Sequence, residues 1–266
     1  MSHRRKVLRK LARDEQRHEI EQRMLEKDRS ADRAVMEEVF DRSTLMVIYD
    51  FLNRGVIDEI YGVVNAGKES RVYWGKDKQG SELAIKIYLT VSAEFRKGML
   101  KYIEGDRRFK GVRRDTRSLI FAWAQKEYKN LKQATSAKVR VPKPTAVEKN
   151  VLIMEFIGKN GTSAPSMKEQ PPKKPEKTYE TLLNHIQRLY RKAQLVHGDL
   201  SEYNVMIWRG RPVIFDVSQA VPPYHPLADS LLHRDLENLN RYFSRLDVKV
   251  SSIEKCYRKV TGHGAS

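Results

Sequence analysis

The strongest chemical signal combines residues 197–204, where Asp199 stands five positions before Asn204, with Asp216, which follows a short apolar strand. Mg²⁺ prefers hard oxygen ligands and usually takes one or two carboxylates together with substrate phosphates. Phosphoryl transfer also needs a carboxylate that orients the incoming nucleophile. Turn-forming residues alone would not explain the flanking strands and the second aspartate. The spacing therefore predicts an ATP-dependent phosphotransferase in which Asn204 and Asp216 hold the metal and Asp199 orients the nucleophile.

A second signal is Lys86, a lone lysine in the apolar strand predicted over residues 83–88. An ammonium group in apolar surroundings is costly unless it meets an anion, and the phosphates of ATP would supply one. Glu127, on a helix predicted over residues 119–134, is placed to pair with Lys86 and orient it. A lysine on an edge strand and a solvated glutamate are the plain alternatives, but beside the first signal the pattern favours an ATP site.

A third signal is the loop at residues 65–70, which lies between two predicted strands where a phosphate-covering loop belongs. Its backbone N–H groups, Lys68 and the Ser70 hydroxyl are predicted to face phosphate oxygens. The loop lacks the full glycine pattern of kinases, so it is a weak motif by itself. At the connection between the two halves, the backbone of Glu155 and Ile157 is predicted to bind adenine.

The order of the predicted elements is a strand-rich half followed by a helix-rich half, which is typical of two lobes around a cleft. Residues 1–42 are predicted to form a basic, charged arm and helix. Residues 43–157 form the predicted N-lobe, with a mobile insertion at 104–118, and residues 158–266 form the predicted C-lobe. Three helices are predicted to begin at the capping residues Ser43, Thr178 and Asp229.

The composition of the chain indicates which kind of partner and which cellular compartment to expect. The 266 residues include 51 Lys and Arg against 34 Asp and Glu, a net charge of +17, which favours a polyanionic partner. The single cysteine, Cys256, makes no internal disulfide and fits a reducing compartment. Neither a secretory signal nor a membrane-spanning stretch is apparent. The sequence therefore predicts a soluble, cytoplasmic protein.

The motifs that carry these signals are Gly-Lys-Glu-Ser (67–70), Ala-Ile-Lys-Ile-Tyr (84–88), Met-Glu-Phe-Ile-Gly (154–158), His-Gly-Asp-Leu-Ser-Glu-Tyr-Asn (197–204) and Phe-Asp-Val-Ser-Gln-Ala-Val (215–221). Together they resemble the RIO family of atypical serine/threonine protein kinases, in its first, Rio1-type subfamily. The resemblance covers about residues 45–245, and its last two motifs are very specific. The second subfamily carries an N-terminal winged-helix domain, for which too few residues precede Gly67.

The resemblance implies a trimmed, two-lobed α+β kinase fold. It also implies that Asp199 is the catalytic aspartate and that Asn204 and Asp216 hold Mg²⁺ or Mn²⁺. Lys86 would hold the ATP phosphates beneath the 67–70 loop. Members of the family are described as kinases that act in maturation of the small ribosomal subunit and its rRNA. They are also described as ATPases that pass through an aspartyl-phosphate, which would form here on Asp216.

Several residues depart from ordinary kinases. Gly198 stands where those enzymes carry arginine, and Asp216-Val217-Ser218 replaces Asp-Phe-Gly. No Ala-Pro-Glu segment follows, because a proline-rich stretch leads almost directly into the next predicted helix. We therefore expect no platform for a peptide substrate, which weakens the claim that a protein side chain is the main acceptor.

Two other functions remain open from the residues. A small-molecule kinase of the aminoglycoside or choline type shares the His-Gly-Asp loop and the asparagine spacing, but the 201–203 and 217–219 segments argue against it. A non-catalytic RNA- or ribosome-binding pseudokinase fits the charge. The intact Lys86, Asp199 and Asp216 argue against that alternative.

Overall fold

The structure is a computed structural model that describes residues 40–90 and 93–262. The predicted basic arm at residues 1–42 lies almost wholly outside the described residues. The chain divides into two compact units, and the boundary falls between Gly55 and Val56.

The first unit contains one described helix, α3 (Arg42–Asn53). Its start is set by Asp41, whose carboxylate accepts the N–H of Thr44 at 2.8 Å. The predicted cap, Ser43, is therefore wrong, because Ser43 already lies inside the helix. An ionised carboxylate at this position satisfies a backbone donor that has no partner within the helix.

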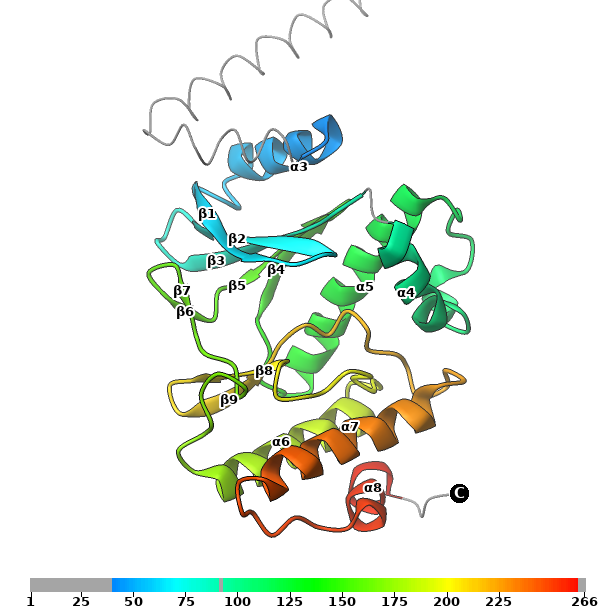
Figure 1. The fold of residues 1–266 in the computed structure, drawn as a ribbon. Helices are drawn as coiled ribbons and strands as arrows, with labels where there is room; N and C mark the ends of the chain where they lie inside the picture. The colour runs from blue at the N-terminus through cyan, green and yellow to red at the C-terminus, as the bar shows by residue number, and fades with distance from the viewer. Residues whose placement is uncertain (1–39, 91–92, 263–266) are drawn as a thin grey trace, which may run out of the picture. The chain divides into compact units, whose positions relative to one another are not determined.

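The second unit begins with an antiparallel sheet in the order β1-β2-β3-β5-β4 (Figure 1). Its strands are β1 (Glu59–Ala66), β2 (Ser70–Lys76), β3 (Glu82–Tyr88), β4 (Pro144–Glu148) and β5 (Val151–Glu155). Lys86 of β3 lies opposite Val72 of β2, and Ala84 lies opposite Met154 of β5. Directly paired residues share a face, and so do residues two apart along a strand. One face of the sheet therefore carries Lys86 together with the apolar side chains of Val72, Ala84 and Met154.

Helix α5 (Thr116–Ser136) packs against β4 and β5 and starts at Asp115, whose carboxylate accepts the N–H of Ser118 at 2.9 Å. Its residues Trp123 and Leu131 are buried in one core. The helix predicted over residues 119–134 is thus confirmed and is longer at both ends. Before it lie α4 (Ala93–Ile103), which the sequence pattern had not indicated, and the short 3-10 helix η1 (Arg107–Phe109).

The C-terminal half is mostly helical. Its elements are β6 (Gly158–Lys159), β7 (Thr162–Ser163), α6 (Pro175–Arg191), β8 (Val205–Trp208), β9 (Arg211–Ile214), α7 (Ala228–Ser244) and α8 (Ile253–Thr261). Helices α6, α7 and α8 contact one another and share a continuous core with α5. Two predicted caps are wrong. Helix α6 begins before Thr178, and Asp229 lies in the first turn of α7, where its charge still favours the helix dipole.

The second unit therefore has a strand-rich lobe and a helix-rich lobe, which confirms the predicted α+β kinase-like fold. Residues 217–227 alone separate Asp216 from α7. This described segment contains no regular element that would serve as a peptide platform, as expected. Among the described residues, no helix combines the length and the apolar character needed to cross a membrane.

Candidate active site

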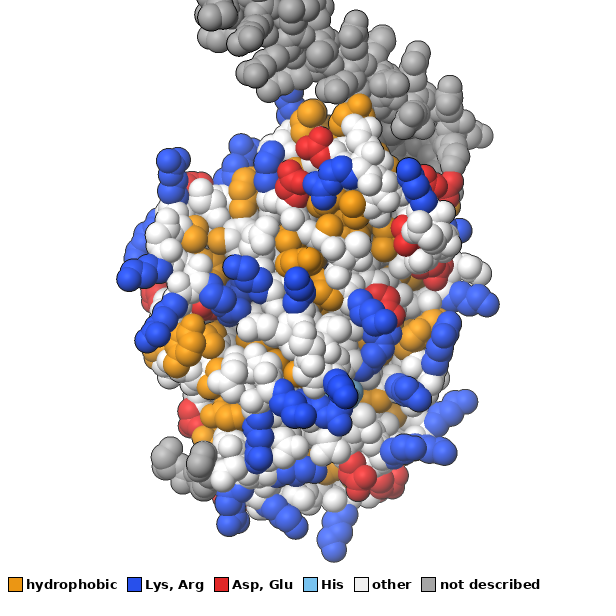
Figure 2. Space-filling view, turned by 180° about the vertical axis from the view of Figure 1, so that it is seen from behind, with side chains coloured by type: hydrophobic (Ala, Val, Ile, Leu, Met, Phe, Trp, Pro, Cys, Tyr) orange, Lys and Arg blue, Asp and Glu red, His pale blue; other side chains and the backbone are white. Residues whose placement is uncertain are grey.

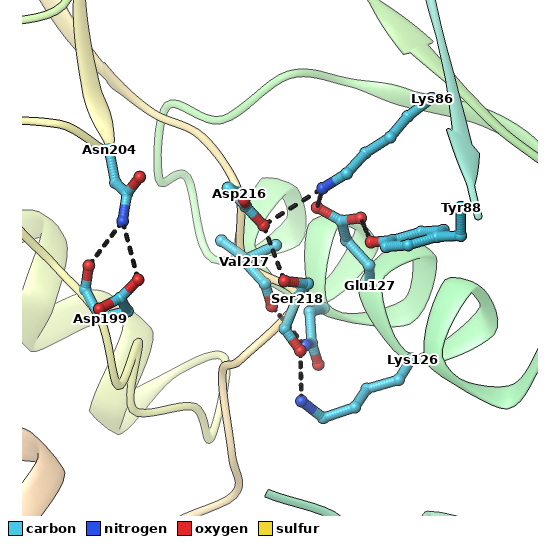
Figure 3. A network of polar contacts seen from close by, with 10 residues as sticks. Lys86, Tyr88, Lys126, Glu127, Asp199, Asn204, Asp216, Val217 and Ser218 are labelled. Carbon is cyan, nitrogen blue, oxygen red and sulfur yellow. Dashed lines mark hydrogen bonds and ion pairs between the residues drawn. The ribbon is translucent and has the colours of Figure 1, made fainter. Parts of the chain in front are cut away.

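Lys86 joins the two lobes. Its Nζ lies 2.9 Å from Oε1 of Glu127 and 3.2 Å from Oδ1 of Asp216 (Figure 3). The side chains of Lys86 and Glu127 are only 7% and 1% exposed, and the Tyr88 hydroxyl donates to the other oxygen of Glu127. Strand β3, helix α5 and the segment after β9 thus meet at one ammonium group, where the geometry suits a negatively charged ligand.

The charged groups around Lys86 shift one another's pKa values. Burial raises the pKa of Glu127, although the positive charge of Lys86 opposes the effect. Burial alone would lower the pKa of Lys86, but the carboxylates of Asp216 and Glu127 outweigh it and raise that pKa. For Asp216, whose side chain is 44% exposed, partial removal from water acts upward, but Lys86 and the Ser218 hydroxyl, 2.7 Å away, lower its pKa to about 2. Asp216 is therefore ionised at neutral pH and keeps its charge for a cation.

The 197–204 loop brings Asp199 and Asn204 together. The Asn204 amide donates to the Asp199 carbonyl at 2.7 Å and to its carboxylate Oδ2 at 3.2 Å. The amide oxygen of Asn204 points away from Asp199 (Figure 3). Burial raises the pKa of Asp199, and the positive charge of Arg234 opposes that rise. Asn204 therefore orients the carboxylate of Asp199 and keeps its own oxygen available.

Side chains of helix α7 hold the backbone of the 197–204 loop. The buried carboxylate of Asp235 accepts the N–H groups of Gly198 and Leu200, each at 2.8 Å. Asn238 donates to the Leu200 carbonyl at 3.0 Å, and Arg234 donates to the Gly198 carbonyl. Burial raises the pKa of Asp235 to about 7, even though the two N–H groups lower it. A single helix thus fixes both sides of Asp199.

Helix α5 holds the 216–221 loop in a different way. The buried ammonium of Lys126 donates to the Ser218 carbonyl, and the Asn130 amide donates to the Val217 carbonyl at 2.8 Å. Burial lowers the pKa of Lys126 well below its ordinary value, and the positive charge of Arg108 lowers it further. The helix that carries Glu127 therefore also positions the backbone that follows Asp216.

The two loops are joined to each other through their backbones. Val196 and Val221 exchange N–H···O bonds of 2.8 and 2.9 Å, and the Phe215 N–H donates to the Asn204 carbonyl at 3.0 Å. These bonds place Asn204 beside the residue that precedes Asp216. The two predicted metal ligands therefore lie at adjacent strand ends of β8 and β9.

The loop between β1 and β2 is less closely connected. Lys68 is exposed, and in the described part of the chain no hydrogen bond joins Lys68 or the Ser70 side chain to the Lys86 centre. The residue between them, Glu69, was not predicted as a site residue. Burial raises the pKa of Glu69, and the negative charge of Asp216 raises it further. Glu69 is therefore the residue of this loop whose pKa responds to the charge of Asp216, while Lys68 and Ser70 stay predictions.

The connection between the lobes contains the predicted adenine contacts. The N–H of Glu155 donates to the Lys143 carbonyl at 2.8 Å, and the Ile157 carbonyl accepts the N–H of Ala164 at 2.8 Å. These bonds occupy one backbone group of each residue. An adenine ring would therefore meet the Glu155 carbonyl and the Ile157 N–H.

Known proteins resemble this chain in sequence. The family model described as RIO domain matches residues 71–256. The chain belongs to the RIO family of atypical protein kinases. The RIO-type serine/threonine-protein kinase Rio1 of Haloferax volcanii is 39% identical over 254 residues, which cover 95% of this chain and 86% of that protein. Serine/threonine-protein kinase RIO1 of Homo sapiens is 37% identical over 87% of this chain, but the match spans only 41% of the human protein.

The fold of this RIO chain also matches solved structures. The Rio2 kinase from Chaetomium thermophilum, in a complex described as ADP/Mg²⁺-phosphoaspartate, aligns with a TM-score of 0.60 and 21% identity. The alignment covers 82% of this chain and 66% of that one. The Rio1 relatives favour a RIO-type kinase over the aminoglycoside- or choline-type alternative.

Sequence reasoning missed the residues that position the two loops of this RIO chain. Asp235 lies among Leu232, Leu236 and Leu239 on the apolar face of α7, where an unpaired carboxylate is costly. A carboxylate on this apolar face was a signal from which the sequence could have predicted a buried anchoring residue. Lys126 and Asn130 gave a weaker one, because charged and polar residues are frequent along α5. Their burial becomes evident only when the 216–221 loop is in place.

Proposed function

We propose that this chain transfers the γ-phosphoryl group of ATP through a site formed by Lys86, Asp199, Asn204 and Asp216. The observation that carries the proposal is the position of the buried Lys86 ammonium between Glu127 and Asp216. In phosphoryl transfer a lysine held by a helical glutamate binds nucleotide phosphates beside a metal-binding aspartate. The names of the Rio1 relatives support the same activity.

The nucleotide would lie between the lobes. Lys86 would bind its phosphates, the loop with Lys68 and Ser70 would cover them, and the backbone of Glu155 and Ile157 would bind adenine. Glu127 is the partner that keeps the Lys86 ammonium fixed at 2.9 Å. Because that ammonium stays charged, the site is prepared for a polyphosphate before it arrives.

The residues present fit Mg²⁺ or Mn²⁺. Asp216 supplies an ionised carboxylate and Asn204 an amide oxygen that points away from Asp199 (Figure 3). In the described residues no group of three or more His, Cys, Asp or Glu side chains gathers for a metal. One carboxylate, one amide and substrate phosphates are a sufficient ligand set for Mg²⁺. The ion, when bound, would neutralise charge that develops on the transferred phosphoryl group.

Asp199 would orient the nucleophile. Its carboxylate is half-buried and is held by Asn204 at 3.2 Å, while Asp235 fixes the backbone on either side. Burial raises the pKa of Asp199, which improves its ability to accept a hydrogen bond from an incoming hydroxyl or water.

We also propose an ATPase cycle through an aspartyl-phosphate. Asp216 is exposed and ionised, so one of its carboxylate oxygens can attack the γ-phosphorus of ATP while the bond to the ADP oxygen breaks. Water would then hydrolyse the acyl phosphate and release inorganic phosphate and free Asp216. The Rio2 complex described with phosphoaspartate supports this chemistry, and so does the lack of a peptide platform in the 217–227 segment.

The partner we propose is the small ribosomal subunit during maturation, through its rRNA or proteins, in the cytoplasm. The net charge of +17 supports a polyanionic partner. Figure 2 shows Lys and Arg side chains spread widely over one face, with Asp and Glu side chains gathered in smaller groups.

The test is incubation of the full chain with γ-labelled ATP and Mg²⁺, followed by acid and then hydroxylamine. Label that survives acid briefly and is removed by hydroxylamine is an acyl phosphate on Asp216, whereas stable label is phosphoserine or phosphothreonine. Turnover should vanish in Asp199→Ala and in Asp216→Asn. Turnover at the wild-type rate in both variants would exclude the proposed site.

A matched control is Asp247→Asn. Both Asp216 and Asp247 have left-handed backbones, with φ of 56° and 60°, so asparagine is tolerated equally at the two positions. Asp247 is exposed and lies outside the site, so its variant should keep full turnover.

A further inference from the structure

A hollow of about 580 Å³ lies beside the connection between the lobes, and none of the proposed phosphate or metal ligands lines it. Four separate parts of the chain meet there: the start of β3, the hinge, the α5–β4 connection and the β8–β9 turn. Its lining residues are Ser81, Glu82, Arg140, Glu155, Phe156, Gly158, Trp208, Arg209 and Arg211. Glu155 is the only proposed ATP-site residue in this set, and it contributes there beside Arg140.

The hollow has unbalanced positive charge. Glu155 pairs with Arg140 through two contacts of 2.7 and 2.8 Å, and Glu82 accepts the N–H of Asn160 at 2.5 Å. Arg140 thereby neutralises Glu155, whereas the N–H of Asn160 is neutral and leaves the charge of Glu82 in place. Arg209 and Arg211 are exposed, and among the residues that the structure describes neither has a carboxylate partner. The lining thus carries three arginines against two glutamates, an excess of one positive charge, and two guanidinium groups are available for an anion from outside.

The β8–β9 turn places an aromatic ring beside these two cations. Trp208 and Arg211 are directly paired across the turn, so their side chains leave the hairpin on one face. The Arg209 guanidinium lies 5.3 Å from the centre of the Trp208 ring. Arg209 itself has a φ of 50°, which is uncommon for a residue other than glycine or asparagine. The turn keeps an arginine where asparagine would fit its backbone more easily.

We propose that this hollow binds a single-stranded RNA segment. Arginine forks bind phosphate groups in a bidentate manner, and an aromatic ring beside arginine is the usual platform for an unpaired base. Arg209 and Arg211 contact the phosphates and Trp208 contacts a base. A single inorganic phosphate would leave most of the 580 Å³ empty and would not use the ring. The choice of RNA rests on the rRNA partner proposed above, but it is independent of phosphoryl transfer.

The test is fluorescence anisotropy of a labelled single-stranded oligonucleotide with the full chain at several salt concentrations. In Arg209→Ser/Arg211→Ser the affinity should fall about tenfold and the salt slope should become shallower by about 1.4, because each phosphate contact to a single strand contributes about 0.7. The control Arg245→Ser/Lys249→Ser removes two exposed charges outside the hollow and should change both quantities much less. Equal losses in the two variants would reduce the effect to net charge and overturn the proposal.

A second readout locates the base. The chain has three tryptophans; Trp123 is buried, and Trp74 is stacked on Tyr61 with ring centres 4.1 Å apart and does not line the hollow. Single-stranded RNA should quench tryptophan fluorescence in the wild type, and Trp208→Phe should remove that response while the melting temperature stays within a few degrees. Quenching that persists in Trp208→Phe contradicts the proposal, and so does equal quenching by inorganic phosphate.

The two proposals fail separately. ATP turnover of Arg209→Ser/Arg211→Ser should stay within about twofold of the wild type, because neither arginine contacts the Lys86 centre. A chain that binds RNA at this hollow but turns over no ATP would remove the proposed kinase activity and keep this site. If the wild type turns over ATP but the double variant binds RNA as tightly as the wild type, the RNA site is excluded and the proposed kinase activity is kept.

Discussion

The two loops that form the candidate site are held by opposite kinds of chemistry. The 197–204 loop is held from α7 mainly by an acceptor, the Asp235 carboxylate, which takes two backbone N–H groups. The 216–221 loop is held from α5 by donors, Lys126 and Asn130, which bind backbone carbonyls. Both anchors act on backbone atoms, but only the first uses a carboxyl group and only the second shares its helix with Glu127.

The difference suggests that the two anchors support different parts of the reaction. Asp235 fixes the backbone around Asp199, so its loss should affect the orientation of the nucleophile. Lys126 and Asn130 fix the backbone after Asp216, so their loss should affect the metal ligand. The following predictions test whether the two anchors can be separated, and they run from the largest expected effect to the smallest.

Asp235→Ala should lower kcat by about 10²-fold, because a misplacement of about 1 Å near the reacting group has that effect. The KM for ATP should stay within about twofold, since Lys86 and the hinge are untouched. Steady-state kinetics measure both constants. The control is Glu237→Ala, an exposed residue on the same helix, which should leave kcat unchanged. A large rise in KM without a fall in kcat would break the proposed division.

Lys126→Met should raise the Mg²⁺ concentration for half-maximal turnover by about tenfold, because a lost hydrogen bond to a buried carbonyl costs about 1–3 kcal/mol. Thermal stability should change little, because the unpaired Ser218 carbonyl costs about 1–3 kcal/mol while methionine avoids the desolvation of a buried ammonium. A Mg²⁺ titration of turnover and a melting curve measure the two effects. Lys129→Met, exposed on the same helix, is the control. An unchanged Mg²⁺ requirement would show that Lys126 has only a structural role.

Double variants sharpen the comparison further. Lys126→Met and Asn130→Ala act on one loop, so their combined effect on the Mg²⁺ requirement should differ from the sum by about 0.5 kcal/mol or more. Lys126→Met and Asp235→Ala act on different loops, so their effects on kcat should add within about 0.5 kcal/mol. Non-additivity in the second pair would indicate that the Val196–Val221 contact couples the anchors.

The last prediction concerns stability at different pH values rather than turnover. Because the folded-state pKa of Asp235 is raised to about 7, the folded chain keeps a proton that the unfolded chain releases near pH 4. The contribution of this group to stability therefore falls as pH rises from 4 to 7, by at most about 1.4 kcal/mol per pH unit. Denaturant unfolding at several pH values should show this slope reduced in Asp235→Asn. An identical slope in the variant would contradict the raised pKa.

Much of this arrangement was predictable from local pattern. Lys86 was recognisable because an ammonium group in an apolar strand needs an anion, and Asp199, Asn204 and Asp216 were recognisable by spacing. The helix starts were not, because Asp41 competes with Ser43 as a cap and only the backbone geometry decides between them. Helix α4 and the loop anchors were missed for a related reason. Their position depends on contacts between segments far apart in the sequence, such as those from α5 to the 216–221 loop.

The contacts from Lys126 and Asn130 have an evolutionary consequence. A carbonyl oxygen is present at every position whatever the side chain, so a substitution at Val217 or Ser218 keeps the carbonyl that the anchor binds. The residues after Asp216 can therefore differ from Asp-Phe-Gly while the contacts from α5 keep the path of the backbone. In such a lineage the path of the loop backbone is determined by the side chains of α5 rather than by those of the loop.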